Sequence, residues 1–303
     1  MAKRIILNRA DFFAALRKDT SPLFGKRLSQ SAVEGIEAIL DAAERHQVTD
    51  IDHVAQMLAQ VYHETGTYML GIKETVMPSH KDKRPSDATV IARLNKAWAA
   101  GQLPWVTTAY WRDGAFGRGP IQLTHWKNYL KMGAALGIDL RNNPDLALDT
   151  KVGADIVVVG MSQGLFTGKK LSDFEFPACL YLDWEKHPRR IVNGKDGTDA
   201  DIAKYHVAFR TALLAGGYQV LDLITAADLA AGAIVPEMLK LDDLNALSAN
   251  LGSVVTGTLG TVGVKVEDGK VTLDKDKILD AVVPPSPWSW LVKLALKFFG
   301  GRS

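Results

Sequence analysis

Two consecutive amphipathic stretches, residues 31–46 and 50–63, constrain the fold more than any other part of the chain. In both, apolar side chains recur at the three- and four-residue spacing that places them on one face of a helix. They are Val33, Ile36, Ile39 and Leu40 in the first stretch, and Val54, Leu58, Val61 and Tyr62 in the second. Asp50 or Asp52 provides the N-cap of the second helix. Further helices are expected over residues 87–99, 126–136, 150–163 and 199–214, whereas strand patterns are weak, so the predicted class is mainly α.

Composition divides the 303 residues into three parts. Residues 1–222 form one helix-rich domain in this interpretation. Residues 223–283 are rich in Ala, Leu, Val, Thr and Gly, and residues 284–303 begin as a Pro-rich spacer. A hydrophobic content of 47% and a charged content of 23% are ordinary for a soluble globular protein.

The C-terminal extension carries two local patterns. Residues 262–273 alternate around Asp268-Gly269, which predicts a β-hairpin. Residues 288–299 form a basic amphipathic helix in which Lys293 and Lys297 share one narrow edge. At ~1.5 Å per residue this helix reaches ~18 Å, short of a ~30 Å hydrocarbon core. Two interpretations stay open: the helix lies on a membrane or outer membrane, or it docks onto a protein surface.

Bulk properties exclude several functions. Lys and Arg number 36 and Asp and Glu 34, and the net charge of +2 is too small to indicate nucleic-acid binding. The single cysteine, Cys179, stands in an apolar run and is expected in the core. The N-terminus has too short an apolar stretch for a secretory signal, and no run of ~18–20 apolar residues occurs. We therefore expect synthesis in a reducing cytoplasm.

Two glutamates ten residues apart, Glu64 and Glu74, are candidate catalytic groups. Glu64 ends an amphipathic helix, where partial desolvation favours the protonated carboxyl that a general acid needs. If that helix continued to Glu74, the two carboxyls would lie ~15 Å apart, too far to cooperate. Gly66 and Gly71 allow the chain to turn back instead. An inverting glycosidase needs a separation of ~6.5–9.5 Å between its carboxyls.

A metal site is not expected at these glutamates. The residue at position 67, one turn after His63-Glu64, is Thr rather than a second His, and the other histidines show no paired spacing. No cofactor is predicted. On their own, the two glutamates have a simpler explanation as solvated surface residues.

A second block, residues 117–129, favours the catalytic interpretation. Gly117 and Gly119 allow close backbone approach, with Arg118 as a fixed positive charge between them. Neutral side chains that hold sugar hydroxyls, acetamido groups or a water follow at Gln122, Thr124 and Asn128. Trp111, Trp126 and Tyr129 are candidates to stack on sugar faces, with burial in the core as the alternative for each.

The chain resembles glycoside hydrolase family 19, in particular its bacteriophage endolysin branch, over residues 30–215. The matching segments are His63-Glu64-Thr65 with Glu74, residues 117–125, Asn128-Tyr129, residues 136–149 and residues 190–194. This resemblance implies a lysozyme-like, two-lobed α-helical fold that cuts β-1,4 links next to N-acetylhexosamines with inversion.

The resemblance also implies roles for individual residues. Glu64 is the general acid, Glu74 the general base, and Thr124 orients the water. The residues expected to bind substrate or to hold the catalytic carboxylates are His63, Arg118, Gln122, Trp126, Asn128, Tyr129, Arg190 and Asn193, with Arg118 and Arg190 in the holding role.

The substrate implied is peptidoglycan, cut as by an N-acetylmuramidase. The chain lacks the disulfides of plant chitinases, and its second glutamate comes much sooner, which removes a cleft wall. A phage lysin of this kind is made in the host cytoplasm and acts on the cell wall in the periplasm after release. Residues 241–260 resemble segments of phage tail-tip and fibre proteins, which favours a virion-borne form.

Three alternatives remain: a chitinase, a lytic transglycosylase that needs one glutamate, and a non-enzymatic wall-binding component.

Overall fold

The computed structural model describes residues 2–18, 21, 23–77, 79–223, 264–267 and 270–273. The chain divides into two compact units, Met1–Thr225 and Ala226–Ser303, and each is described by itself.

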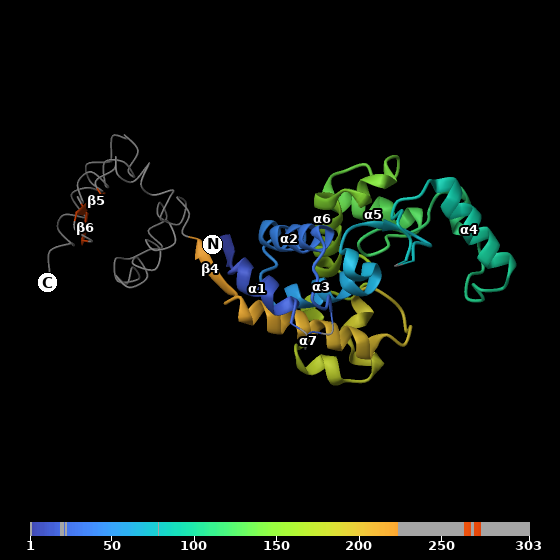
Figure 1. The fold of residues 1–303 in the computed structure, drawn as a ribbon. Coiled ribbons are helices and arrows are strands. Elements are labelled where there is room, and N and C mark those ends of the chain that lie inside the picture. Colours follow the sequence, from blue (N-terminus) through green and yellow to red (C-terminus); the bar gives the residue numbers. More distant parts are fainter. Residues whose placement is uncertain are drawn as a thin grey trace, which may run out of the picture. The chain divides into compact units, whose positions relative to one another are not determined.

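Helices dominate the first unit, which confirms the mainly α prediction (Figure 1). The α-helices are α1 Arg9–Leu16, α2 Gln30–Arg45, α3 Ile51–Thr65, α4 Asp87–Ala99, α5 Trp126–Leu136, α6 Thr150–Gln163 and α7 Asp199–Ala215. Short 3-10 helices connect them: η1 Gly66–Tyr68, η2 Tyr110–Asp113, η3 Pro144–Leu148, η4 Leu171–Asp173, η5 Ala178–Tyr181, η6 Trp184–Lys186 and η7 Pro188–Ile191. Helices α2 to α7 lie where the sequence predicts them, whereas α1 was not predicted.

Side-chain caps fix where the long helices begin. The Asp50 carboxylate accepts hydrogen bonds from the backbone N–H groups of Asp52 and His53 at 2.9 and 3.1 Å, so Asp50 is the N-cap of α3. Asp149 caps α6 in the same way, accepting from Lys151 and Val152. Asp52, the alternative cap of α3, binds Arg210 instead.

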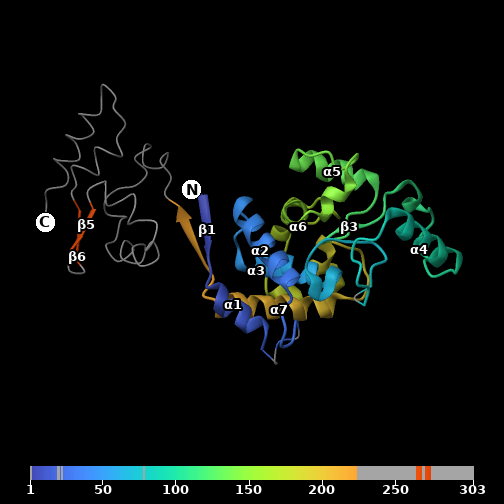
Figure 2. The same ribbon diagram turned by 45° about the horizontal axis from the view of Figure 1, so that its top comes forward.

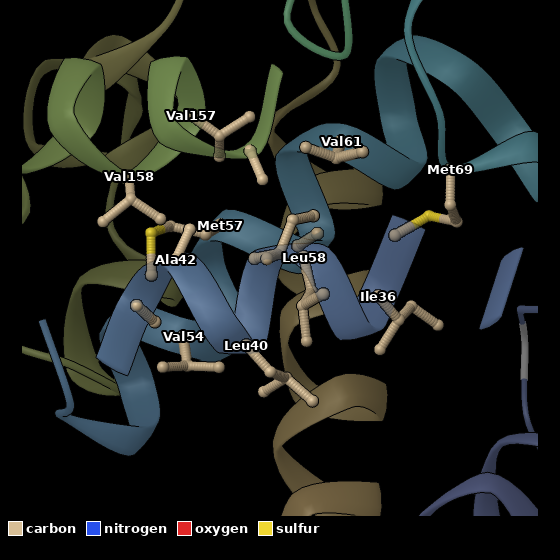
Figure 3. Close-up of a cluster of buried hydrophobic side chains, with 14 of the residues drawn as sticks. Ile36, Leu40, Ala42, Val54, Met57, Leu58, Val61, Met69, Val157 and Val158 are labelled. Carbon is tan, nitrogen blue, oxygen red and sulfur yellow. The ribbon is translucent and has the colours of Figure 1, made fainter. Parts of the chain in front are cut away.

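Helix α3 is the centre of the larger hydrophobic core. It packs against α2, α6 and α7. Figure 3 shows the contact among α2, α3 and α6, where Leu58 of α3 points toward Ile36 and Leu40 of α2 and lies below Val157 of α6. Five residues of this contact are at most 1% exposed: Ile36, Leu40, Leu58, Val61 and Val157. A helix buried on several sides can hold a functional group at its end with little freedom.

A second, smaller core lies at the other end of the unit. It consists of Val90 and Leu94 of α4 with Trp111 and Phe116. Figures 1 and 2 both show α4 standing apart from α2, α3 and α6. Two separate cores in one unit agree with the predicted two-lobed architecture.

Short antiparallel sheets complete the first unit. Strand β1 Ala2–Ile6 pairs with β4 Gln219–Leu223, with Lys3 opposite Asp222. This pairing was not predicted. Strand β2 Ile72–Lys73 pairs with β3 Arg118–Gly119. This pairing brings the segment that follows Glu64 next to the start of the block 117–129, here called the glycine-bounded block.

The second unit contains a hairpin, as predicted. Strands β5 Val264–Glu267 and β6 Lys270–Leu273 are antiparallel, with Glu267 opposite Lys270 across the turn. The tail-like segment 241–260, the spacer 284–287 and the predicted amphipathic helix 288–299 lie outside the described residues. Within the described residues, every helix is too short or too polar to cross a bilayer.

Candidate active site

Glu64 lies in the last turn of α3. The helix ends at Thr65, and Gly66 follows with φ 60°, a left-handed conformation that glycine adopts without a steric penalty. The prediction that the helix does not continue to Glu74 is therefore confirmed. After η1 the chain passes into β2, which ends at Lys73. Glu64 and Glu74 thus lie on different supports: the end of a buried helix and the end of a strand.

Arg189, in η7, holds the Glu64 side chain. Its Nη1 lies 2.8 Å from Glu64 Oε1 and donates a second hydrogen bond to Gln60 Oε1 at 2.7 Å. Gln60 is one helical turn before Glu64 on α3, and both Gln60 and Arg189 are buried. The Glu64 side chain retains 17% exposure, so its carboxyl is partly desolvated and fixed on one side.

Asp196 shares the charge of Arg189. Its Oδ2 accepts from Arg189 Nε at 3.0 Å and from Nη2 at 2.7 Å, while Nη1 is directed to Glu64. Burial opposes the ionised form of Asp196, but the hydrogen bonds from Arg189 and Thr198 outweigh it and lower the pKa to about 2. Asp196 is therefore the permanent counterion of Arg189, and Glu64 has no cation to itself.

The prediction that Arg190 holds a catalytic carboxylate is wrong. Arg190 Nη1 contacts Glu185 instead, both at its backbone oxygen and, at 3.6 Å, at its carboxylate. Arg190 also lines a cavity of about 300 Å³ with Cys179 at its wall. In the tight turn of η7 neighbouring side chains point in different directions, so Arg189 rather than Arg190 contacts Glu64.

Glu74 follows β2 and is held to the glycine-bounded block by its backbone and its side chain. Its N–H donates to the Gly117 oxygen at 2.8 Å, and its Oε2 accepts from the Gly117 N–H at 2.7 Å. Its other carboxylate oxygen, Oε1, accepts from the Tyr110 hydroxyl at 2.7 Å. Each oxygen of the Glu74 carboxylate thus accepts one hydrogen bond, and the two donors come from different parts of the chain.

The predicted close approach at Gly117 is confirmed. A Cβ atom there would lie 2.8 Å from Gln122 Oε1, 3.3 Å from Thr124 Cγ2 and 3.4 Å from Glu74 Oε2. Gly117 thus allows Glu74, Gln122 and Thr124 to gather around one point of the backbone.

Gln122 and Asn128 are tied to the backbone. Gln122, with φ 54°, donates from Nε2 to the oxygens of Ile72 and Gly119, each at 3.0 Å. Asn128 Nδ2 donates to the Thr124 oxygen at 2.8 Å. These bonds occupy both N–H groups of the Gln122 amide and one of the two N–H groups of Asn128, so Gln122 offers a ligand its oxygen and Asn128 its oxygen and one N–H.

Arg118 does not hold either catalytic carboxylate, contrary to the prediction. It is 1% exposed and donates to Asp87 and Asp145 at 2.8 and 2.7 Å. Lys73 binds the same two carboxylates at 2.6 and 3.1 Å. The four side chains form a closed ion network that joins β2 and β3 to α4 and η3. The network does not touch Glu74. It holds in place Lys73 and Arg118, which are next to Glu74 and Gly117 in sequence.

Tyr129 was a candidate to stack on sugar or to be buried in the core, and the second alternative is confirmed: the residue is fully buried and its hydroxyl donates to the Phe116 oxygen at 2.9 Å. Its predicted place among the substrate-binding residues is therefore wrong. Burial raises the pKa of Tyr129 to about 12 even though Arg118 opposes this rise. Trp111 is fully buried too, so it is a core residue. Trp126 is half-buried between the Tyr129 ring and the Arg141 guanidinium, which lies 3.8 Å from its ring centre.

His63 and Asn193 lie on the Glu64 side of the site. Burial, with the charge of Arg189, lowers the pKa of His63 despite the neighbouring Glu64. Asn193 is exposed and donates from Nδ2 to Asp196 Oδ2 at 3.1 Å. Among the described residues, no group of His, Cys, Asp and Glu is arranged to hold a metal ion.

Sequence reasoning missed three residues that contact the two glutamates or their partners: Tyr110, Arg189 and Asp196. The only sequence signal for Arg189 was its position next to Arg190, which begins the matching segment 190–194. Asp196 follows Asn193 by three residues but carries no local pattern, and Tyr110 was hidden among aromatic residues of the small core.

Comparison with known proteins gives one family match. Residues 38–161, which include both glutamates and the block 117–129, match the family Glyco_hydro_19, chitinase class I. Chitinase 11 of Oryza sativa subsp. japonica is 71% identical over 31 residues, which are 10% of this chain and 12% of that protein. Endochitinase 1 of Solanum tuberosum is 57% identical over 37 residues, 12% of each chain. The chain therefore spans about an eighth of the length of these relatives.

Among solved structures, a mutant form of chitinase C matches with 22% identity and a TM-score of 0.41, over 70% of this chain and 92% of that chain. Chitinase C from Streptomyces griseus matches over the same shares, with 22% identity and a TM-score of 0.38.

Proposed function

We propose that this chain, in which residues 38–161 form a domain of glycoside hydrolase family 19, chitinase class I, hydrolyses β-1,4 bonds in a polymer of N-acetylhexosamines. One observation carries the proposal: the matched segment contains both glutamates, each held by its own hydrogen-bond donors. Arg189 holds Glu64 at the end of α3, and Tyr110 and Gly117 hold Glu74 after β2.

The two environments favour different roles. Glu64, partly desolvated and without a cation of its own, protonates the glycosidic oxygen as general acid. Glu74, oriented by a donor on each oxygen, takes a proton from the attacking water as general base. Thr124, packed beside Gly117, orients that water. A single displacement of this kind inverts the anomeric carbon.

Gln122, Asn128 and Asn193 bind sugar hydroxyl and acetamido groups in this proposal, together with His63 and Trp126. The oxygen of Gln122 is suited to accept from sugar N–H and O–H groups, because both of its amide N–H groups are already bonded to the backbone. Asn128, with one N–H bonded to the backbone, can accept through its oxygen and donate through its second N–H.

Chitin is the substrate that the similar proteins favour, since both plant relatives carry chitinase names. Peptidoglycan is the second candidate, and the short connection of nine residues between Glu64 and Glu74 supports it. On that alternative the chain is a phage-type lysin that acts as a muramidase on the cell wall in the periplasm, after release from the host cytoplasm or from a virion.

One experiment separates these outcomes. The full chain is incubated with N-acetylglucosamine hexamer and, separately, with purified peptidoglycan, and products are identified by mass spectrometry and by the anomer formed. Glu64→Gln and Glu74→Gln should each lower turnover by at least about 100-fold. Glu34→Gln, an exposed glutamate on α2, serves as the control.

Each product pattern has one meaning. Products with a newly formed α-anomer support the inverting mechanism, and the polymer that is cut identifies the substrate. Anhydro sugars would instead identify a lytic transglycosylase. Binding of either polymer without products would favour a wall-binding component, and full activity of Glu64→Gln would remove Glu64 as the acid.

We further propose that residues 288–299 contact a membrane. Equal killing of intact Gram-negative cells by the full chain and by a chain ending at Val283 would contradict this.

A further inference from the structure

We propose that Tyr110 is a positioning residue for Glu74. Tyr110 packs on the smaller core of Val90, Leu94, Trp111 and Phe116, here called the small lobe, and from there it fixes the orientation of the Glu74 carboxylate. This inference rests on the proposed function, in which Glu74 activates the water. Tyr110 acts through Glu74 and need not touch the substrate.

Two donors on different elements hold the Glu74 carboxylate. The Tyr110 hydroxyl, in η2, lies 2.7 Å from Oε1, and the Gly117 N–H, next to β3, lies 2.7 Å from Oε2. The terminal torsion of a glutamate is broad, so a carboxylate with a single donor rotates easily about it. With a donor on each oxygen, rotation breaks two charge-assisted hydrogen bonds. The lone pairs directed away from these donors are thereby kept in one direction for a water.

Tyr110 is itself held in place by its neighbours. Its ring lies 5.1 Å from the ring of Trp111, at 81°, and 4.4 Å from that of His125, at 58°. Trp111 is fully buried in the small core, and Trp111 Nε1 donates to Asn95 of α4 at 3.0 Å. The hydroxyl of Tyr110 is therefore a rigid extension of the small lobe.

The Tyr110 hydroxyl stays protonated while the site works. Burial, and then the charge of Glu74, raises the pKa of Tyr110 above its usual range. A hydroxyl that does not ionise donates at every pH at which Glu74 is charged. The bond thus stabilises the ionised form of Glu74, and its loss should make that form harder to reach.

Few other titratable groups surround this pair. Tyr129 donates its proton to a backbone oxygen, and His125 covers the Tyr110 ring. The charges of Lys73 and Arg118, adjacent in sequence to Glu74 and Gly117, are neutralised by the carboxylates of Asp87 and Asp145.

Tyr110→Phe in the full chain tests the proposal, since it keeps the ring and removes only the hydroxyl. With the polymer that the wild-type chain cuts, kcat should fall by about 10- to 100-fold while KM changes by less than about twofold. The acid limb of the pH–rate profile should move to higher pH, because the charged carboxylate loses one of its two donors. Tyr181→Phe, at a tyrosine that is 74% exposed, should change neither quantity.

A second readout does not depend on activity. NMR titration of carboxyl-labelled glutamate, with Glu74 assigned by Glu74→Gln, should show a higher ionisation midpoint in Tyr110→Phe than in the wild type. An unchanged midpoint together with an unchanged acid limb would overturn the proposal, even if kcat fell, because only a packing defect would remain. If the wild-type chain cuts neither polymer, the proposed function fails, and the NMR titration still decides the role of Tyr110.

Discussion

Arg189 binds Glu64 through one nitrogen only, Nη1, at 2.8 Å. Its remaining N–H groups are directed to Asp196, and Nη1 also reaches Gln60. The arginine thus fixes the position of the candidate acid while a different carboxylate balances its charge.

Replacement of Arg189 should therefore cost both activity and stability. Arg189→Ala removes the arginine that donates to Glu64 and Gln60 and leaves Asp196 without its cation, so we expect loss of at least about 100-fold in kcat and about 3 kcal/mol in the free energy of unfolding. Activity assays and urea unfolding measure these changes. Arg190→Ala is the matched control and should stay within about threefold of wild-type activity. The reverse order of the two effects would show that Arg190 holds the acid after all.

The crowding at Gly117 makes a small substitution costly for function. A Cβ atom 2.8 Å from Gln122 Oε1 and 3.4 Å from Glu74 Oε2 forces one of these side chains to move. We expect Gly117→Ala to lower kcat by at least about tenfold, measured on the same substrate as the wild type. Gly194→Ala, where a new Cβ meets nothing within 4 Å, should leave kcat unchanged. Unaltered activity of Gly117→Ala would mean that Glu74 need not lie where it does.

The ion network around Arg118 should behave cooperatively. Asp87 and Asp145 are about half exposed, so loss of either carboxylate leaves the other to balance the two buried cations. We expect Asp87→Asn and Asp145→Asn each to cost about 1 kcal/mol of unfolding free energy. The double variant should cost about 1–2 kcal/mol more than the sum, because Arg118 and Lys73 then lack a counterion. Additive urea-unfolding energies would contradict the closed network.

Acid should destabilise the fold through His187. This residue is 1% exposed, and its Nδ1 accepts from the Arg189 N–H at 3.1 Å. Burial lowers the pKa of His187. The charge of Asp199 raises this pKa and that of Arg189 lowers it, and the net result is a lowered pKa. His187 therefore binds a proton more readily in the unfolded chain than in the folded one. The contribution of neutral His187 to the free energy of unfolding is complete above about pH 6.5 and is lost as the pH falls below that value.

Chemical unfolding between pH 8 and pH 5 measures this effect, with a slope of at most about 1.4 kcal/mol per pH unit from one histidine. His187→Asn keeps an acceptor in a similar place and cannot take up the proton, so the slope should become shallower. His80→Asn is the control, because His80 Nδ1 also accepts a backbone N–H at 3.1 Å but the residue is only half-buried. An unchanged slope in His187→Asn would exclude His187 as the source.

The helices could be predicted because their apolar periodicity and caps are local. Asp50, for example, begins α3 through bonds to residues two and three positions ahead. The pairing of β1 with β4 joins Lys3 to Asp222, and neither strand carries a pattern that names its partner. Long-range pairing of short, half-exposed strands is invisible to a local pattern.

The same contrast holds in the candidate site. Glu64, Glu74 and Gly117 were predictable because motif spacing and a required close approach leave traces in sequence. Whether Arg189 or Arg190 reaches Glu64 depends on the direction of side chains in a single 3-10 turn. Arg118 shows the opposite error, since a charge between two glycines was assigned to a catalytic partner although Asp87 and Asp145 bind it.

The strand pair β1–β4 also has a consequence for biosynthesis. Ile6 meets Gln219 and Lys3 meets Asp222, so strand β1 waits for a partner that is made more than two hundred residues later. The amino-terminal strand must remain unpaired throughout that interval, and the helices between can pack before it does. The first unit can thus close at this sheet only after residues 219–223 have been made, and a nascent chain halted before residue 219 exposes a free strand edge to its neighbours.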